Sequence, residues 1–132
     1  MTRHRRLLRL VRDTGRYRTD EEAARVLTAV LTHLGPQLSG DERRDLAAVL
    51  PERARAVLTA RLPLPAPVSA PAFVEAVAET LGTSLAAARW DASSVLVTLA
   101  GSAGSGLTAR LLARLPRGYA LLFGRPDLTV AA

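Results

Sequence analysis

Apolar residues recur at helical spacing along most of the chain and are interrupted by proline, glycine and short polar stretches. Between residues 20 and 34 the apolar positions follow each other three or four residues apart, as they do on one face of an amphipathic helix. The sequence Thr19-x-x-Glu22 precedes them as a capping box, and Gly35-Pro36 ends the pattern. A helix over about residues 20–34 is therefore predicted.

The same reasoning predicts about eight helices. Ser39-x-x-Glu42 is a second capping box before a helix that carries Leu46 and Leu50, and Pro51 is suited to be the first residue of a short helix ending near Leu58. Leu7, Leu8, Val11 and Thr14 form one face of a helix at the amino end. Four more helices are predicted after residue 70. The first begins near Pro71 and carries Phe73, Val74, Val77 and Leu81. The apolar residues of the other three are, in order, Ala92, Val95, Leu96 and Leu99; Leu111, Leu112 and Leu115; and Tyr119, Leu122 and Phe123.

An internal similarity relates the two halves of the chain. A shift of 65 positions places residues 23–58 over 88–123 without a gap, and a shift of 66 extends the match upstream. The identical pairs in the longer match are Ala23/Ala88, Val30/Val95, Leu31/Leu96, Leu34/Leu99, Leu46/Leu111, Ala48/Ala113, Leu50/Leu115 and Pro51/Pro116; upstream, Leu7/Phe73, Leu8/Val74, Val11/Val77 and Thr14/Thr80 correspond. Because most matched positions are apolar, each copy would bury the same faces.

These patterns predict an all-α, single-domain protein over residues 1–132, built from two tandem helical repeats packed as one bundle. Repeat one covers about residues 5–60 and repeat two about residues 71–124. Between them, residues 61–70 form a Pro-rich connector, which favours a semi-rigid, extended conformation.

Several segments resemble one bacterial family. They are Thr19-Asp-Glu-Glu-Ala-Ala-Arg-Val-Leu, then Leu-Ser-Gly-Asp-Glu-Arg-Arg-Asp-Leu-Ala-Ala-Val-Leu-Pro51, then a second Leu115-Pro116 with Tyr119 and Phe123. From about Val11 to Phe123 the chain is similar to the domain-of-unknown-function 2267 family. The resemblance implies an all-helical, duplicated fold and supplies no activity, cofactor or catalytic residue. The chain differs from the family's usual pattern at Gly101–Gly106, which stand in place of an acidic capping sequence.

Composition removes many kinds of catalytic site. The chain has no cysteine and only two histidines, His4 and His33, so it lacks thiolate ligands, a cysteine nucleophile and most zinc-site arrangements. The acidic pairs Glu21/Glu22 and Asp41/Glu42 fall in the first turns of predicted helices, where the helix dipole favours negative charge. We therefore expect no enzyme, no cofactor and no metal. Trp90 and Tyr119 are expected in the core, although Trp90 aligns with Arg25 and is alternatively an exposed difference between the halves.

Positive charge is concentrated at one end of the chain. The net charge is +6 and all 18 basic residues are arginine; residues 1–18 hold seven arginines and one aspartate, whereas the other 114 residues hold 11 arginines and 11 acids. Lys, Asn and Ile are absent, which suggests a GC-rich coding sequence. The arginines that a helical wheel places together, opposite Leu7 and Val11, are Arg5, Arg9, Arg12 and Arg16. Such a column can follow the phosphates of a nucleic acid; the alternatives are a solvated face, an acidic protein and a membrane surface.

A second basic group consists of Arg110, Arg114 and Arg117, spaced by four and three residues on a predicted helix. No acidic residue lies between Asp91 and Asp127. If the fold brings this helix beside the N-terminal one, the two would form a single basic face. The alternative is a solvated surface.

A glycine-rich segment imitates a phosphate-binding loop. Gly101 and Gly106 have the Gly-x-x-x-x-Gly spacing with Thr108 two residues further on, and Ser94–Ala100 can pass for the preceding strand. However, Leu107 occupies the lysine position, and the corresponding stretch of repeat one is typical of helix–turn–helix. We therefore predict a flexible turn between two helices.

No stretch is apolar for long enough to span a bilayer, and none near the amino end is continuous enough for a secretory signal, so we expect a cytoplasmic protein. The predicted function is a non-enzymatic protein-binding or scaffolding module, whose partner is an unknown protein or a second copy. The alternative is nucleic-acid binding through the arginine-rich N-terminal helix.

Overall fold

Eight α-helices and one short 3₁₀ helix form within residues 2–125, the part of the chain that the computed structural model describes, and no strand occurs there. The first half contains α1 (Arg3–Gly15), α2 (Asp20–Leu34), η1 (Gly35–Gln37), α3 (Gly40–Val49) and α4 (Glu52–Leu58). The second half contains α5 (Ala70–Leu81), α6 (Leu85–Ala103), α7 (Ser105–Arg114) and α8 (Tyr119–Leu122). The predicted all-α fold class is confirmed.

Hydroxyl side chains begin half of these helices. A Ser or Thr immediately before the helix accepts a hydrogen bond from the backbone N–H three residues later, and these residues are Thr2, Thr19, Ser69 and Ser84. Ser39 was predicted to act in the same way before α3, but its side chain makes no such bond. The next residue, Gly40, has a φ of +60°, and this left-handed backbone departs from the geometry in which a cap hydroxyl meets the first turn.

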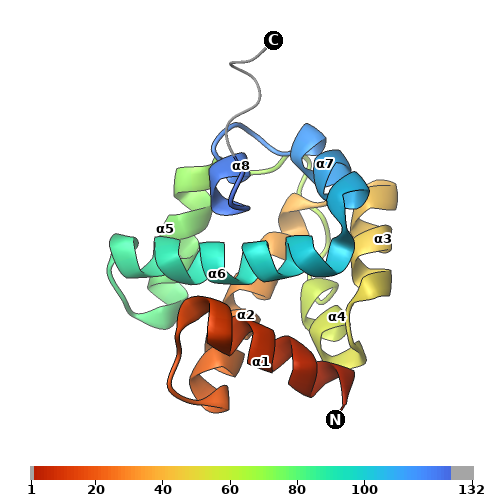
Figure 1. The fold of residues 1–132 in the computed structure, drawn as a ribbon. Helices are drawn as coiled ribbons and strands as arrows, with labels where there is room; N and C mark the ends of the chain where they lie inside the picture. Colours follow the sequence, from red (N-terminus) through yellow and green to blue (C-terminus); the bar gives the residue numbers. More distant parts are fainter. Residues whose placement is uncertain (1, 126–132) are drawn as a thin grey trace.

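The helices of the two halves pack across one another (Figure 1). Helix α1 contacts α2 of its own half and α6 of the other half, while α5 contacts α6 of its own half and α2 of the other. The short helices α4 and α8 lie against α2 and α6, respectively, and α3 pairs with α7. One continuous core of leucine, valine and alanine results, and it includes a Phe73–Tyr119 ring pair with centroids 5.5 Å apart. The removal of this apolar surface from water drives folding.

Two hydrogen bonds between the halves correspond to each other under the repeat alignment. The hydroxyls of Thr14 and Thr98 lie 3.3 Å apart, and His33 Nε2 lies 2.7 Å from the Thr80 hydroxyl. Residue 80 follows 14 by 66 positions, and residue 98 follows 33 by 65, so the two contacts exchange under the predicted repeat. The duplication stays a prediction, and this exchange supports it.

The turn between α6 and α7 is much shorter than predicted. Gly101 continues α6, which ends only at Ala103, and α7 begins at Ser105. The N–H of Gly104 still donates to the carbonyl of Ala100 at 3.0 Å, while the φ of +86° at Gly104 turns the chain. A turn between two helices is present as predicted, but its predicted extent over Gly101–Gly106 is wrong, because a single glycine with positive φ suffices to separate the two helices.

Within residues 2–125, no helix is both long and apolar enough to cross a membrane.

Candidate functional site

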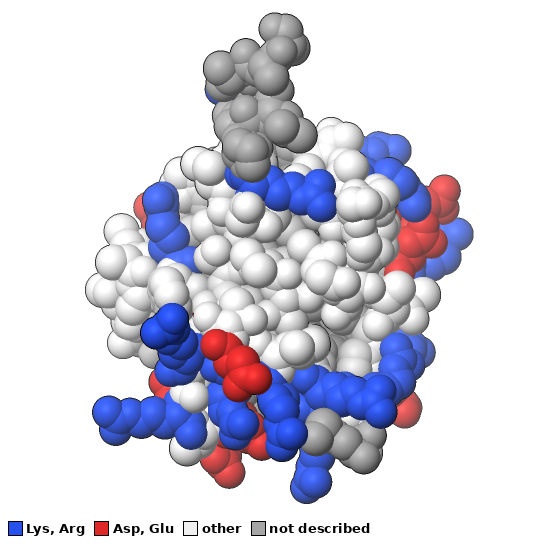
Figure 2. All heavy atoms as spheres, viewed as in Figure 1, with Lys and Arg blue, Asp and Glu red and all other residues white. Residues whose placement is uncertain are grey.

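The arginines of α1 point away from the core. Leu7 and Val11 are buried beneath the helix, whereas Arg5, Arg9 and Arg16 are exposed, and among the described residues none of these three side chains has a hydrogen-bond or ion-pair partner. Blue atoms gather over the lower part of the molecule in Figure 2, where Figure 1 places α1. We name Arg5, Arg9, Arg12 and Arg16 the α1 arginine face.

Arg12 differs from the other members of this face. It is partly buried, and its guanidinium lies 3.0 Å from a carboxylate oxygen of Asp20 and 3.9 Å from one of Asp13. The acidic first turn of α2 thus neutralises one arginine of the four. The free positive charge of the face comes from the other three.

The second basic group lies elsewhere in the fold. Helix α7 packs against α3 and α6, at the end of the molecule opposite α1 (Figure 1). The α3 side chains pair with it, Arg110 with Asp45 at 2.8 Å and Arg114 with Glu42 at 3.1 Å. Arg117 is exposed beyond the end of α7. The single basic face considered from the sequence is therefore not formed, because the fold places α7 beside the acidic residues of α3.

The exposed side of α6 forms an uncharged surface. Residues 92–109 contain no charged side chain, and Figure 2 shows a broad white area over α6 with charged atoms at its edges. Trp90, Val97 and Leu121 expose 53%, 38% and 63% of their surface there. We name these three residues, with Ser93 and Gly101 on the same side of α6, the α6 face. The charge-free run was visible in the sequence, but only the packing of α6 shows that one side of it remains exposed.

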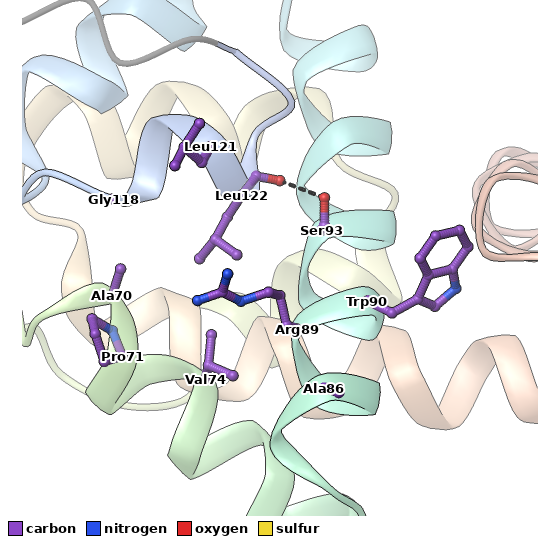
Figure 3. Close-up of a pocket in the computed structure, with 10 residues that line it drawn as sticks. All are labelled: Ala70, Pro71, Val74, Ala86, Arg89, Trp90, Ser93, Gly118, Leu121 and Leu122. Carbon is purple, nitrogen blue, oxygen red and sulfur yellow. Dashed lines mark hydrogen bonds between the residues drawn. The ribbon is translucent and has the colours of Figure 1, made fainter. Parts of the chain in front are cut away.

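A pocket of about 390 Å³ opens beside the α6 face, between α5, α6 and α8. Its walls are mostly apolar, and Arg89 is its only charged lining residue (Figure 3). The Arg89 guanidinium extends between Val74 and Leu122 in this view. The hydroxyl of Ser93, the other polar side chain that points there, donates to the carbonyl of Leu122 at 3.0 Å.

A polar contact fixes the end of α1 against α6. The Tyr17 hydroxyl donates to an Asp91 carboxylate oxygen at 2.5 Å, and Trp90 Nε1 donates to the carbonyl of Gly15 at 3.0 Å. Burial raises the pKa of Asp91 even though the Tyr17 hydrogen bond lowers it, and burial together with the contact to Asp91 raises the pKa of Tyr17. We name these four residues the α1–α6 lock. It sets the position of the α1 arginine face relative to the α6 face.

Trp90 and Tyr119, both expected in the core, have different environments. Tyr119 is completely buried and donates to the carbonyl of Val68 at 2.9 Å. Trp90 is half-exposed on the α6 face. The alternative interpretation of Trp90, an exposed difference between the halves, is therefore the correct one.

The profile of a protein family described as "uncharacterized conserved protein (DUF2267)" matches residues 4–122. The chain belongs to the DUF2267 family. The match extends from the first turn of α1 to the end of α8, so the family resemblance inferred from the sequence is confirmed over the whole helical fold. No curated protein matches the chain.

The described part of this DUF2267 protein holds no group of three or more His, Asp or Glu side chains arranged to bind a metal ion. The segment that imitates a phosphate loop is helical on both sides of Gly104. Ser94–Ala100 belong to α6, and α7 begins at Ser105. The Thr108 hydroxyl is buried and donates to the carbonyl of Gly104 at 2.7 Å. This geometry is not the strand–loop–helix on which a phosphate loop depends.

Proposed function

We propose that this DUF2267 protein is a non-enzymatic protein-binding module and that the α6 face is its contact surface. The observation that carries the proposal is the exposure of Trp90 and Val97 on α6 and of Leu121 on α8, beside the uncharged run of residues 92–109. Apolar patches surrounded by polar residues mark interaction sites on soluble proteins. Their centres lack charge, and tryptophan is enriched among the residues that dominate binding energy.

The charge around the α6 face favours an acidic partner over a second copy. The α1–α6 lock brings the positively charged α1 alongside α6 and engages Asp91, the one carboxylate that α6 carries. A partner with an apolar centre and acidic edges would gain attraction from this arrangement. A second copy carries the same net charge of +6, so two copies repel each other at long range.

The test compares Val97→Asp with Leu62→Asp. Both substitutions place a carboxylate on an exposed apolar residue, but Leu62 lies in the connector, with 86% of its surface exposed. Proteins crosslinked to the chain in its source cells are identified, and the affinity of each purified partner is then measured by calorimetry. We expect Val97→Asp to weaken binding by about 30-fold or more, since residues central to an interface contribute about 2 kcal/mol or more. Equal affinity for Val97→Asp and the wild type would refute the proposal.

Nucleic-acid binding is the second candidate, and the α1 arginine face is the observation that favours it. Arg5, Arg9 and Arg16 are exposed on one side of a helix and lack partners within the described residues. Arginines in this arrangement release counterions when they contact phosphates. Affinity for a DNA duplex would then fall steeply as salt is added.

The test of this candidate is a salt titration of duplex binding. Replacing Arg5, Arg9 and Arg16 by Gln is expected to lower the slope of log affinity against log salt by about 3, since each phosphate contact contributes about 0.9. In the control, three other exposed arginines, Arg25, Arg44 and Arg61, are replaced by Gln, which removes the same amount of charge. If the two triple variants have the same slope, the α1 arginine face is not the binding surface.

A further inference from the structure

The pocket beside α6 has a counterpart in the first half of the molecule. The pocket of about 390 Å³ lies between the first, second and fourth helices of the second half, α5, α6 and α8. A cavity of about 90 Å³ lies between the first, second and fourth helices of the first half, α1, α2 and α4. The two spaces occupy corresponding places, yet one is about four times larger than the other.

Substitutions at aligned positions explain the difference in size. His4, Leu8 and Arg53 line the small cavity. At the shift of 66, extended to residue 4, the repeat alignment pairs His4 with Ala70 and Leu8 with Val74. At the shift of 65 it pairs Arg53 with Gly118, and all three partners line the large pocket. At each of the three positions the second half carries the smaller side chain, which enlarges the space, whereas Arg89 and Leu122 of the large pocket are larger than the aligned Ala24 and Val57.

Gly118 keeps this space open in a way that few substitutions would permit. Its φ is +98°, a backbone conformation that residues other than glycine rarely adopt. A Cβ atom at this position would also lie only 3.0 Å from the Cβ of Ala70. Both the backbone and the neighbouring side chain therefore restrict position 118 to glycine.

The large pocket contains a cation at a position where the small cavity has an alanine. Arg89 aligns with Ala24 of the first half. Its guanidinium extends over apolar walls (Figure 3), no acidic residue lines the pocket, and within the described residues it has neither a hydrogen bond nor an ion pair. Among the described residues, Arg53 of the small cavity also lacks an ion pair, so the two spaces differ in the position of the cation and in the volume around it.

We propose that this pocket binds a small amphipathic carboxylate. The carboxylate pairs with the Arg89 guanidinium, whose fork of N–H groups matches the two oxygens. The hydrocarbon part lies against Val74, Leu121 and Leu122. The pocket volume falls at the low end of the range of about 300–1,000 Å³ typical of ligand sites, so the ligand is of modest size. This proposal goes beyond the protein-binding function and does not depend on it.

The experiment is calorimetric titration of the purified chain with octanoate, and with octanol and octylammonium as neutral and cationic probes of the same length. Arg89→Gln removes the charge from an exposed side chain and is expected to leave the fold intact. Arg53→Gln is the matched control, because Arg53 is an exposed arginine that lines the corresponding small cavity. Val74→Leu restores the residue of the first half and narrows the pocket.

We expect octanoate to bind, octanol and octylammonium to bind at least 10-fold more weakly, and Arg89→Gln to weaken octanoate binding about 10-fold or more. Val74→Leu should weaken it as well, while Arg53→Gln and Val97→Asp should not. Absence of octanoate binding to the wild type, or equal binding to Arg89→Gln, would overturn the proposal. Because Val97→Asp tests the α6 face separately, failure of either proposal is recognised independently of the other.

Discussion

The hydrogen bond between Tyr17 and Asp91 gives a direct test of the α1–α6 lock. Replacing Tyr17 by Phe keeps the ring, which packs back on Gly15, and removes only the hydroxyl that donates to Asp91 at 2.5 Å. The half-buried carboxylate of Asp91 then loses a donor. We expect this substitution to destabilise the protein and to loosen α1 from α6.

The magnitude follows from the charge and exposure of the acceptor. A hydrogen bond to a charged group contributes about 1.5–3 kcal/mol, and because Asp91 is only partly buried, water recovers part of this contribution. We therefore expect Tyr17→Phe to lower the free energy of unfolding by about 1–2 kcal/mol. For a chain of 132 residues this corresponds to a decrease of about 4–8 °C in Tm.

Urea unfolding followed by circular dichroism measures this effect, and a double-mutant cycle with Asp91→Ala isolates the contact. The coupling between Tyr17→Phe and Asp91→Ala should account for most of the loss. Tyr119→Phe is the control, since the Tyr119 hydroxyl donates to the carbonyl of Val68 and shares no partner with Asp91; its coupling to Asp91→Ala should be within about 0.5 kcal/mol of zero. A cost below about 0.5 kcal/mol for Tyr17→Phe, or a coupling no larger than that of the control, would refute the reasoning.

Two further predictions concern a glycine pair and the alkaline limit of stability. Gly35→Ala should destabilise the fold by about 3 kcal/mol or more, because the added Cβ would collide with the backbone carbonyl of Leu58. Gly101 has open space around it inside α6, so Gly101→Ala should stabilise the fold by about 0.5–1 kcal/mol. Equal urea midpoints for the two variants would contradict this prediction. Burial raises the pKa of Tyr17 and of Tyr119 above the unfolded value of 10.0. The contribution of the two protonated hydroxyls to the free energy of unfolding is therefore complete below pH 10.0 and is lost as the pH rises further. Tyrosinate absorbance should therefore appear together with unfolding, and ionisation of either tyrosine near its ordinary pKa in the intact fold would contradict this prediction.

The sequence predicted the helices because local signals and long-range burial agree in most of them. Thr19 begins α2 by accepting a hydrogen bond from the N–H of Glu22 at 3.1 Å, and the valines and leucines of α2 are all buried. The prediction failed where a local signal was ambiguous. Glycine at position 101 has no side-chain preference, so whether it ends a helix or continues one depends on the packing of α6 against α1 and α5.

The candidate surfaces were only partly accessible to sequence reasoning. The helical period places Arg5, Arg9 and Arg16 opposite Leu7 and Val11 in any amphipathic helix, so the direction of the α1 arginine face followed from spacing alone. The pairing of Arg110 with Asp45 did not, because it depends on α7 lying beside α3. No periodicity indicates which helices become neighbours.

The sequence by itself determined that the chain is helical, where most helices begin and end, and which side of α1 carries charge, because these properties depend on residues within one or two turns of each other. Only the tertiary structure decided that Tyr17 reaches Asp91, 74 residues away, and that Trp90 remains exposed while Tyr119 is buried. It also decided that the second half encloses a larger pocket than the first. Each of these depends on the relative placement of helices far apart in the chain, which the summed burial of both halves sets.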